Sequence, residues 1–344
     1  MALHSHLLPL YGPLILWVGF GWGLGRILPP QVPQTLGKGL FWGGVPLGIA
    51  IFLRQADLSS NIWLAPAIAW LAVGLGAALS SLWIQQPWYP LGRWIGQKMG
   101  RSSLPSGRHP YRWSSAERGS FMNASMLGNT GYLGYPIVLS LVPQQYFAWA
   151  VFYDTLGSTL ASYGLAVMLA SHFSQPQPET TAEIAKSPMG HPMTIVQQMG
   201  HTLLKTPALW GFTLGLLAKS ILLPPTVETG LRWVAWGIIS SALLLLGMRL
   251  SQLTSWHHMR PAMVSLSIKM LLIPLMIGLG LKWMGLETFP LLVLVLQMGM
   301  PPAFATLIIA EAYGLERNLT VTTLATGSIL ILTTLPLWLA LFGP

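Results

Sequence analysis

Two apolar stretches of the chain contain glycine, proline and amide residues where a membrane span would ordinarily be uniformly apolar. Proline removes a backbone donor and clashes with the preceding turn, so each stretch is predicted to break near mid-membrane. Broken backbone at that depth is tolerated where it is buried in protein or lines a cavity, and the N–H groups that begin the following half-helix suit an anion. The residues expected to form this substrate site are Asn129, Thr130, Gly131 and Pro136 in one stretch and Gln297, Pro301 and Pro302 in the other.

Two ionisable residues, Asp154 and Lys269, lie inside other apolar stretches. A charged side chain at mid-bilayer costs about 3 kcal/mol on insertion scales, so such residues face a cavity or a partner. Two interpretations of Asp154 stay open: it binds a coupling ion, H+ or Na+, or it neutralises Lys269. For Lys269 the pairing or structural interpretation is favoured.

Other kinds of chemistry find no support in the residues. The chain has no cysteine, which excludes thiolate chemistry and disulfides. The HExxH, GxSxG and P-loop motifs are missing, so an enzyme and an ATP-driven pump are both disfavoured. His257 and His258 are too isolated to indicate a metal site. We therefore expect no catalytic residue, no metal and no cofactor.

The residues of the substrate site must be positioned by membrane helices. Hydrophobic residues make up 53% of the chain and charged residues 8%, which leaves too little polar surface for a soluble domain. About 20 mainly apolar residues cross a bilayer. The predicted fold class is an all-α integral membrane protein with ten transmembrane helices, at approximately 7–27, 36–53, 61–84, 117–142, 145–171, 206–223, 229–250, 261–284, 289–312 and 319–342.

An internal repeat indicates how these helices are arranged. Residues 28–67 align without a gap to residues 223–262, and ten of the 40 positions are identical, Arg54 with Arg249 among them. Each copy begins a set of five spans, and an odd number of spans inverts the second copy, as in many secondary transporters. The predicted organisation is a first inverted repeat at 1–172, a cytoplasmic linker at 173–202 and a second inverted repeat at 203–344.

Basic residues indicate the topology. Most Lys and Arg residues fall in connections on one side of the ten-span arrangement, and this side is predicted to be cytoplasmic. Both termini are therefore predicted to lie outside the cytoplasm, with the chain in the plasma (inner) membrane. The net charge of +9 is attributed to topology and lipid headgroups, and no nucleic-acid partner is expected because no nucleic-acid module is present.

Several runs of sequence resemble the auxin efflux carrier family of membrane transport proteins. They are GNTGYLGYP at 128–136, MPPAFATLIIAEAYG at 300–314, the tail at 319–342 and, more weakly, ALLLLGMRL at 242–250. The resemblance implies a five-plus-five inverted fold in which the fourth and ninth helices are broken and cross at the substrate site. It also implies a relation to the bile-acid sodium symporter fold, with a scaffold and a moving transport domain. The chain has a shorter central loop than the plant carriers and no asparagine before the proline of the ninth span, which argues against auxin itself as the substrate.

The function predicted from these features is secondary active transport of small organic anions, with export as the expected direction. Alternating access would be achieved by an elevator-like movement, with a carboxylate bound where helices four and nine cross. The alternative is an anion channel or passive facilitator that uses the same crossing. The expected partners are the organic anion and the lipid bilayer, and a homodimer is left open.

Overall fold

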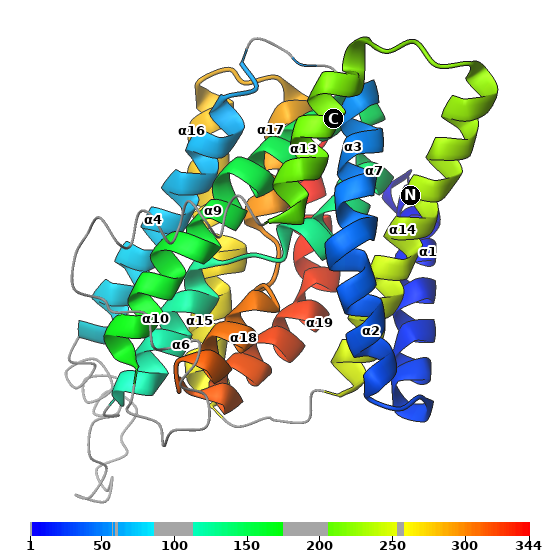
Figure 1. The fold of residues 1–344 in the computed structure, drawn as a ribbon. Coiled ribbons are helices and arrows are strands. Elements are labelled where there is room, and N and C mark those ends of the chain that lie inside the picture. The colour runs from blue at the N-terminus through cyan, green and yellow to red at the C-terminus, as the bar shows by residue number, and fades with distance from the viewer. Residues whose placement is uncertain (1, 57, 59–60, 86–112, 175–205, 253–257) are drawn as a thin grey trace, which may run out of the picture.

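The computed structural model describes the chain except for residues 1, 57, 59–60, 86–112, 175–205 and 253–257. Within these described ranges the chain is helical, with one isolated β-bridge and no strand (Figure 1). Five helical segments are long and apolar enough to cross a membrane: Gln31–Arg54, Leu64–Gln85, Pro225–Ser251, Met259–Trp283 and Arg317–Phe342. The prediction of an all-helical membrane protein is therefore confirmed.

The first half of the chain is built from α-helices, several of which are joined by short π-helical or 3-10 segments. Their bounds are α1 Ala2–Ile27, α2 Gln31–Gly39, η1 Leu40–Gly44, α3 Val45–Gln55, α4 Leu64–Gln85, α6 Ser115–Met126, η2 Thr130–Gly134, α7 Tyr135–Leu141, η3 Gln144–Tyr146, α8 Phe147–Phe152, η4 Tyr153–Ser158, α9 Thr159–Ala161, η5 Ser162–Ala166 and α10 Val167–Phe173. The segments from α2 to α3 and from α8 to α10 each run on as one rod, because π-helical turns join their pieces without a gap.

The second half is likewise built from α-helices with short π-helical or 3-10 segments. Its helices are α13 Pro207–Leu217, η7 Ala218–Ser220, α14 Pro225–Ser251, α15 Met259–Ser267, η8 Ile268–Leu272, α16 Ile273–Trp283, α17 Thr288–Met298, α18 Ala305–Ala312 and α19 Arg317–Phe342. Every segment that the sequence analysis predicted as a span falls on one or more of these helices.

Two groups of helices can be distinguished. We call α1, α2, α3, α13 and α14 the scaffold group, because α1 packs along α14 and α13 packs along α3. The remaining helices form a second group in which α4 packs on α6 and η4, and α15 packs on α19. Figure 1 shows α1, α2, α3 and α14 on one side of the molecule and α4, α6, α10, α15 and α18 on the other.

Glycines allow the close packing within the scaffold group. A Cβ on Gly21 would overlap the backbone of Leu244, and one on Gly247 would overlap the backbone of Val18, so α1 and α14 touch backbone to backbone. Small residues allow such approach between helices in lipid. Gly19 and Gly23 have the same spacing as Gly21 and Gly25, but a Cβ added at either of them would have no neighbour within 4 Å. The face at Gly21 and Gly25 is the one that packs.

A capping box fixes the start of α6. The Ser114 hydroxyl accepts from the backbone N–H of Glu117 at 3.1 Å, and the Glu117 carboxylate accepts from the N–H of Ser114 at 2.8 Å. We expect Ser114→Ala to lower the free energy of unfolding by about 1 kcal/mol, because a helix N–H loses its partner. Thermal melting of the purified protein in detergent measures this loss. Ser241→Ala, which removes a hydroxyl from the partly exposed middle of α14, should melt like the parent, and equal melting of both variants would refute the role of the cap.

Candidate functional site

The fourth predicted span is interrupted after α6. Helix α6 ends at Met126, and Leu127 has extended backbone with φ −95° and ψ 123°. Asn129 is also non-helical, and the chain turns back into helix at Thr130, where η2 begins and leads into α7. Gly128 provides the bend without a side chain, and Leu127 and Asn129 are both buried.

The ninth predicted span is interrupted after α17. Helix α17 ends at Met298, and α18 begins only at Ala305. Pro301 and Pro302 occupy the gap, where their missing backbone donors prevent the helix from continuing. Met300, Pro301 and Pro302 are buried.

The two interruptions lie against each other. The N–H of Asn129 donates to the carbonyl of Pro301 at 2.8 Å, and the N–H of Ala303 donates to the carbonyl of Leu127 at 3.1 Å. Gly128 and Pro302 therefore form an antiparallel bridge. We call these two segments, 127–129 and 301–303, the crossover. Each segment satisfies backbone groups of the other that an interrupted membrane helix would leave without partners.

Asp154 is joined to the beginning of the second half of the fourth span. Its carboxylate accepts hydrogen bonds from the Thr130 hydroxyl and from the Tyr135 hydroxyl, the latter at 2.7 Å. Asp154 is 8% exposed. Gly131 faces the same carboxylate, because a Cβ there would lie 3.3 Å from Asp154 Oδ2. The structure thus brings Thr130, Gly131 and Asp154 together, beside the crossover.

Lys269 lies on the other side of the crossover. Its ammonium donates to the carbonyl of Met298, the last residue of α17, at 2.7 Å. A cation at this position complements the partial negative charge at the end of a helix. Gly128 leaves room for it, since a Cβ there would lie 3.2 Å from Lys269 Nζ. None of the ion pairs among the described residues joins Lys269 to Asp154, so the two residues have separate partners in this structure.

The remaining predicted site residues are placed differently. Gln297 is fully buried in α17, with its amide nitrogen 3.5 Å from the carbonyl of Ala150 and its amide oxygen without a partner in the described part of the chain. Gly134 makes room for that amide. Pro136 lies in the first turn of α7, beyond the bend. It is therefore outside the backbone crossing, and the bend attributed to it is made at Gly128 and Asn129.

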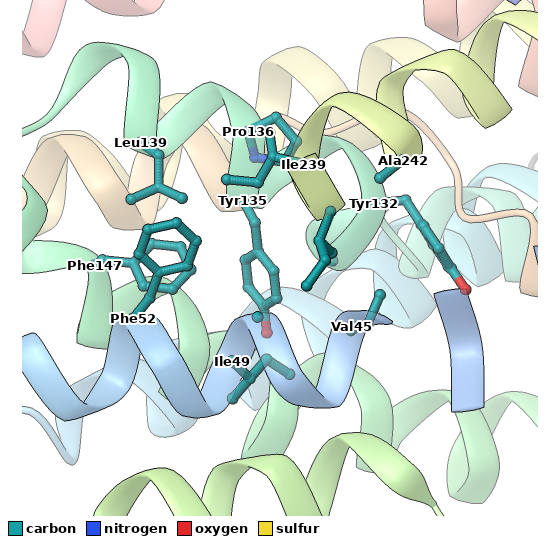
Figure 2. Close-up of a pocket in the computed structure, with 13 residues that line it drawn as sticks. Val45, Ile49, Phe52, Tyr132, Tyr135, Pro136, Leu139, Phe147, Ile239 and Ala242 are labelled. Atoms are coloured by element: carbon teal, nitrogen blue, oxygen red, sulfur yellow. The ribbon is translucent and has the colours of Figure 1, made fainter. Parts of the chain in front are cut away.

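A small pocket separates η2 and α7 from the scaffold group (Figure 2). Residues from α3, α7, α8 and α14 line it, including Ile49, Phe52, Tyr135, Pro136, Phe147 and Ala242. Its cavity volume is about 30 Å³, enough for about two or three water molecules. The lining is apolar apart from tyrosine hydroxyls, so it suits the hydrocarbon part of a ligand.

Two residues of this region were missed by the sequence analysis. Tyr135 belongs to the 128–136 run, but its hydrogen bond to Asp154 depends on how distant helices pack. Arg249 was named only in the repeat alignment, yet its guanidinium lies 5.1 Å from the centre of the Phe304 ring, next to the crossover. The alignment of Arg54 with Arg249 was the available signal. In the ranges the structure describes, no cluster of three His, Asp or Glu side chains could hold a metal.

The chain has apolar helices long enough to span a membrane. It also has helices that are interrupted at buried backbone. These features are those of a multi-pass membrane protein of the transporter class. The model of the family described as "Membrane transport protein" matches residues 111–339, and the chain belongs to that family. This agrees with the resemblance to the auxin efflux carriers.

Two relatives are also transporters by description. An uncharacterized transporter of Methanothermobacter thermautotrophicus is 27% identical over 322 residues, which cover 91% of this chain and 90% of the relative. An uncharacterized transporter of Methanocaldococcus jannaschii is 23% identical over 232 residues, or 67% of this chain and 71% of the relative. The match to the first relative extends over nearly the whole length of both proteins.

Proposed function

We propose that this protein is a secondary active transporter of small organic anions that works by alternating access. The observation that carries the proposal is the crossover, in which two interrupted helices meet in buried surroundings through backbone hydrogen bonds. The first N–H groups of a helix have no partner within the helix, and at the start of η2 such groups would favour a negatively charged ligand. Asn129 supports this assignment, because its side chain donates no hydrogen bond to a described residue and is free to orient a carboxylate.

The proposed architecture is ten spans in two inverted repeats, at 1–172 and 203–344, joined by a cytoplasmic linker. Its support is the symmetry of the packing: the first helices of each half, α1 and α13, pack on the second helices of the other half, α14 and α3. An inverted repeat with broken helices at the centre is a recurring plan of secondary transporters. We extend this to a relation with the bile-acid sodium symporter fold, to termini outside the cytoplasm and to the plasma membrane.

The proposed movement is an elevator-like displacement of the second group of helices against the scaffold group. The pocket lies between the two groups, and its volume of about 30 Å³ is far below the roughly 300 Å³ of a typical ligand site. Binding of an organic anion there requires the two groups to separate. We assign Asp154 as the coupling residue for H+ or Na+, because it bonds directly to the first residue of η2.

Reconstitution of the full chain in liposomes tests this function. Uptake of a panel of labelled carboxylates should saturate with concentration and show counterflow, and a large single-channel conductance would instead establish a channel. A thermal-shift screen of carboxylic acids selects the panel.

The site assignment predicts the behaviour of two variants. Asn129→Ala should lower uptake about tenfold, because an anion-binding contact worth roughly 1.4 kcal/mol is lost. Pro301→Ala should also lower uptake, because it restores a backbone N–H in the segment where the ninth span is interrupted. Both variants should still elute as folded protein from size-exclusion chromatography. Ser241→Ala on a partly exposed side of α14 is the control, and parent-like uptake by both site variants would move the substrate away from the crossover.

A further inference from the structure

Arg249 lies near the end of scaffold helix α14 and faces both interrupted spans. Its guanidinium carbon is 5.1 Å from the centre of the Phe304 ring, and Phe304 directly precedes α18. Tyr132, in η2 of the other interrupted span, is close enough to Arg249 for an electrostatic interaction. The side chain is half-buried. A positive charge of the scaffold group thus lies beside the second group of helices, next to the crossover.

The repeat provides a direct comparison for this arginine. Arg54 aligns with Arg249, and it pairs with Glu228 and donates to the carbonyl of Ile221. For Arg249, no carboxylate among the described residues forms an ion pair and its guanidinium donates no hydrogen bond to them. A guanidinium has five donors and loses solvation when it is partly buried. Arg54 is therefore paired with a carboxylate of the protein. Arg249 is not paired with one among the described residues, so its charge is available to a bound anion.

The apolar pocket lies along the same helix as Arg249. The guanidinium packs directly on Gly37 in α2, because a Cβ there would lie 2.7 Å from Arg249 Nη2. Ala242, which lines the apolar pocket, lies seven residues earlier on the same face of α14. Two helical turns correspond to roughly 10 Å. A molecule with its apolar part in the opened pocket would bring a carboxylate within reach of Arg249, whose planar fork matches the two carboxylate oxygens.

We propose that Arg249 recognises the carboxylate of the transported anion and holds it between the scaffold group and the crossover. This inference rests on the proposed function, because it names the residue that gives the site its preference for a negative charge. It assigns to the scaffold group the charge recognition that the sequence analysis sought only in the broken helices.

Binding of acids and of their neutral amides to the purified full chain tests this role. The probes are benzoate with benzamide and hexanoate with hexanamide, since each amide keeps the size and shape of its acid and removes the charge. The parent should bind each acid at least about tenfold more tightly than the amide. In Arg249→Gln the acid should bind on the order of 10- to 100-fold more weakly, as expected for loss of a charge-assisted hydrogen bond, while the amide should bind as before.

A matched control is available on another helix of the scaffold group. Arg26 on α1 also lies over an aromatic ring, with its guanidinium carbon 3.7 Å from the centre of Trp22, but on an exposed face. Arg26→Gln removes the same charge and should leave the binding of all four probes unchanged. A purely structural contact of Arg249 with Phe304 would weaken acid and amide alike.

The outcomes separate the two proposals. If the parent shows no preference for either acid over its amide, the organic-anion function is refuted, and the role of Arg249 is refuted with it. If the parent has that preference and Arg249→Gln keeps it, only the role of Arg249 is overturned. If Arg249→Gln does not yield folded protein, Arg249→Lys decides: it should bind the acids at least about threefold more weakly than the parent, and parent-like binding would refute the proposal.

Discussion

In Asp154→Asn, substrate uptake should fall about tenfold or more and should no longer change with pH. The Asp154 carboxylate accepts from two hydroxyl groups, those of Thr130 and Tyr135. An asparagine side chain offers one acceptor oxygen and replaces the other by a donor, so the proton of one hydroxyl loses its acceptor in a buried site. Such a loss costs about 1–3 kcal/mol. An amide also cannot bind and release a proton during the transport cycle.

Uptake into liposomes, measured between pH 5 and pH 8 for parent and variant, checks this result. Tyr135→Phe is the control for the hydrogen bond alone, because it removes one donor and keeps the carboxylate; it should slow uptake but retain the pH dependence of the parent. The double variant Asp154→Asn/Tyr135→Phe should lose less than the sum of the two single effects, since the residues act on one another directly. A variant with asparagine at 154 and the pH profile of the parent would make this residue a packing element only.

Gly247→Val should have the largest effect on folding. A side chain at this position would overlap the backbone of Val18 and lie 2.7 Å from the backbone nitrogen of Trp22. Backbone atoms cannot move aside unless α1 separates from α14, so the cost should exceed the 1–3 kcal/mol that is usual for an overpacked site. We expect the melting temperature to fall by about 10 °C, or folded protein to be lost.

The matched control lies on the same helix. Gly237 in α14 is exposed, and a Cβ added there would have no neighbouring atom within 4 Å, so Gly237→Val introduces the same β-branched residue without the overlap. Fluorescence-detected size-exclusion chromatography and thermal melting of both variants make the comparison. Equal melting of the two would show that close contact of α1 with α14 does not hold the scaffold group together.

The all-helical membrane class could be predicted because it depends on composition and on the length of apolar segments, which are local properties. The positions of Pro301 and Pro302 in an interruption follow from their missing donors. Pro136 was misjudged for a related reason: proline is tolerated in the first turn of a helix, where its N–H would have no partner. The missing N–H of proline is therefore compatible with two positions, the end of one helix and the first turn of the next.

The partners of the buried groups could not be predicted, because they depend on which helices meet. Asp154 bonds to residues of a different helical segment, and Lys269 bonds to a main-chain carbonyl that carries no signature in the sequence. The choice between the two glycine faces of α1 is a similar case. Residues 19 and 23 have the same spacing as 21 and 25, and only the position of α14 distinguishes them.

The backbone bridge between Gly128 and Pro302 joins residues that are made far apart in time during translation. Until the ribosome has produced the ninth span, Leu127 and Asn129 lack the partners that they have in the finished protein. The fourth span must therefore enter the bilayer with polar backbone groups that are held by water, lipid headgroups or a membrane insertase. The hydrogen bonds between the two interruptions can form only after the second half has been inserted, so assembly of the crossover is a late event in biogenesis.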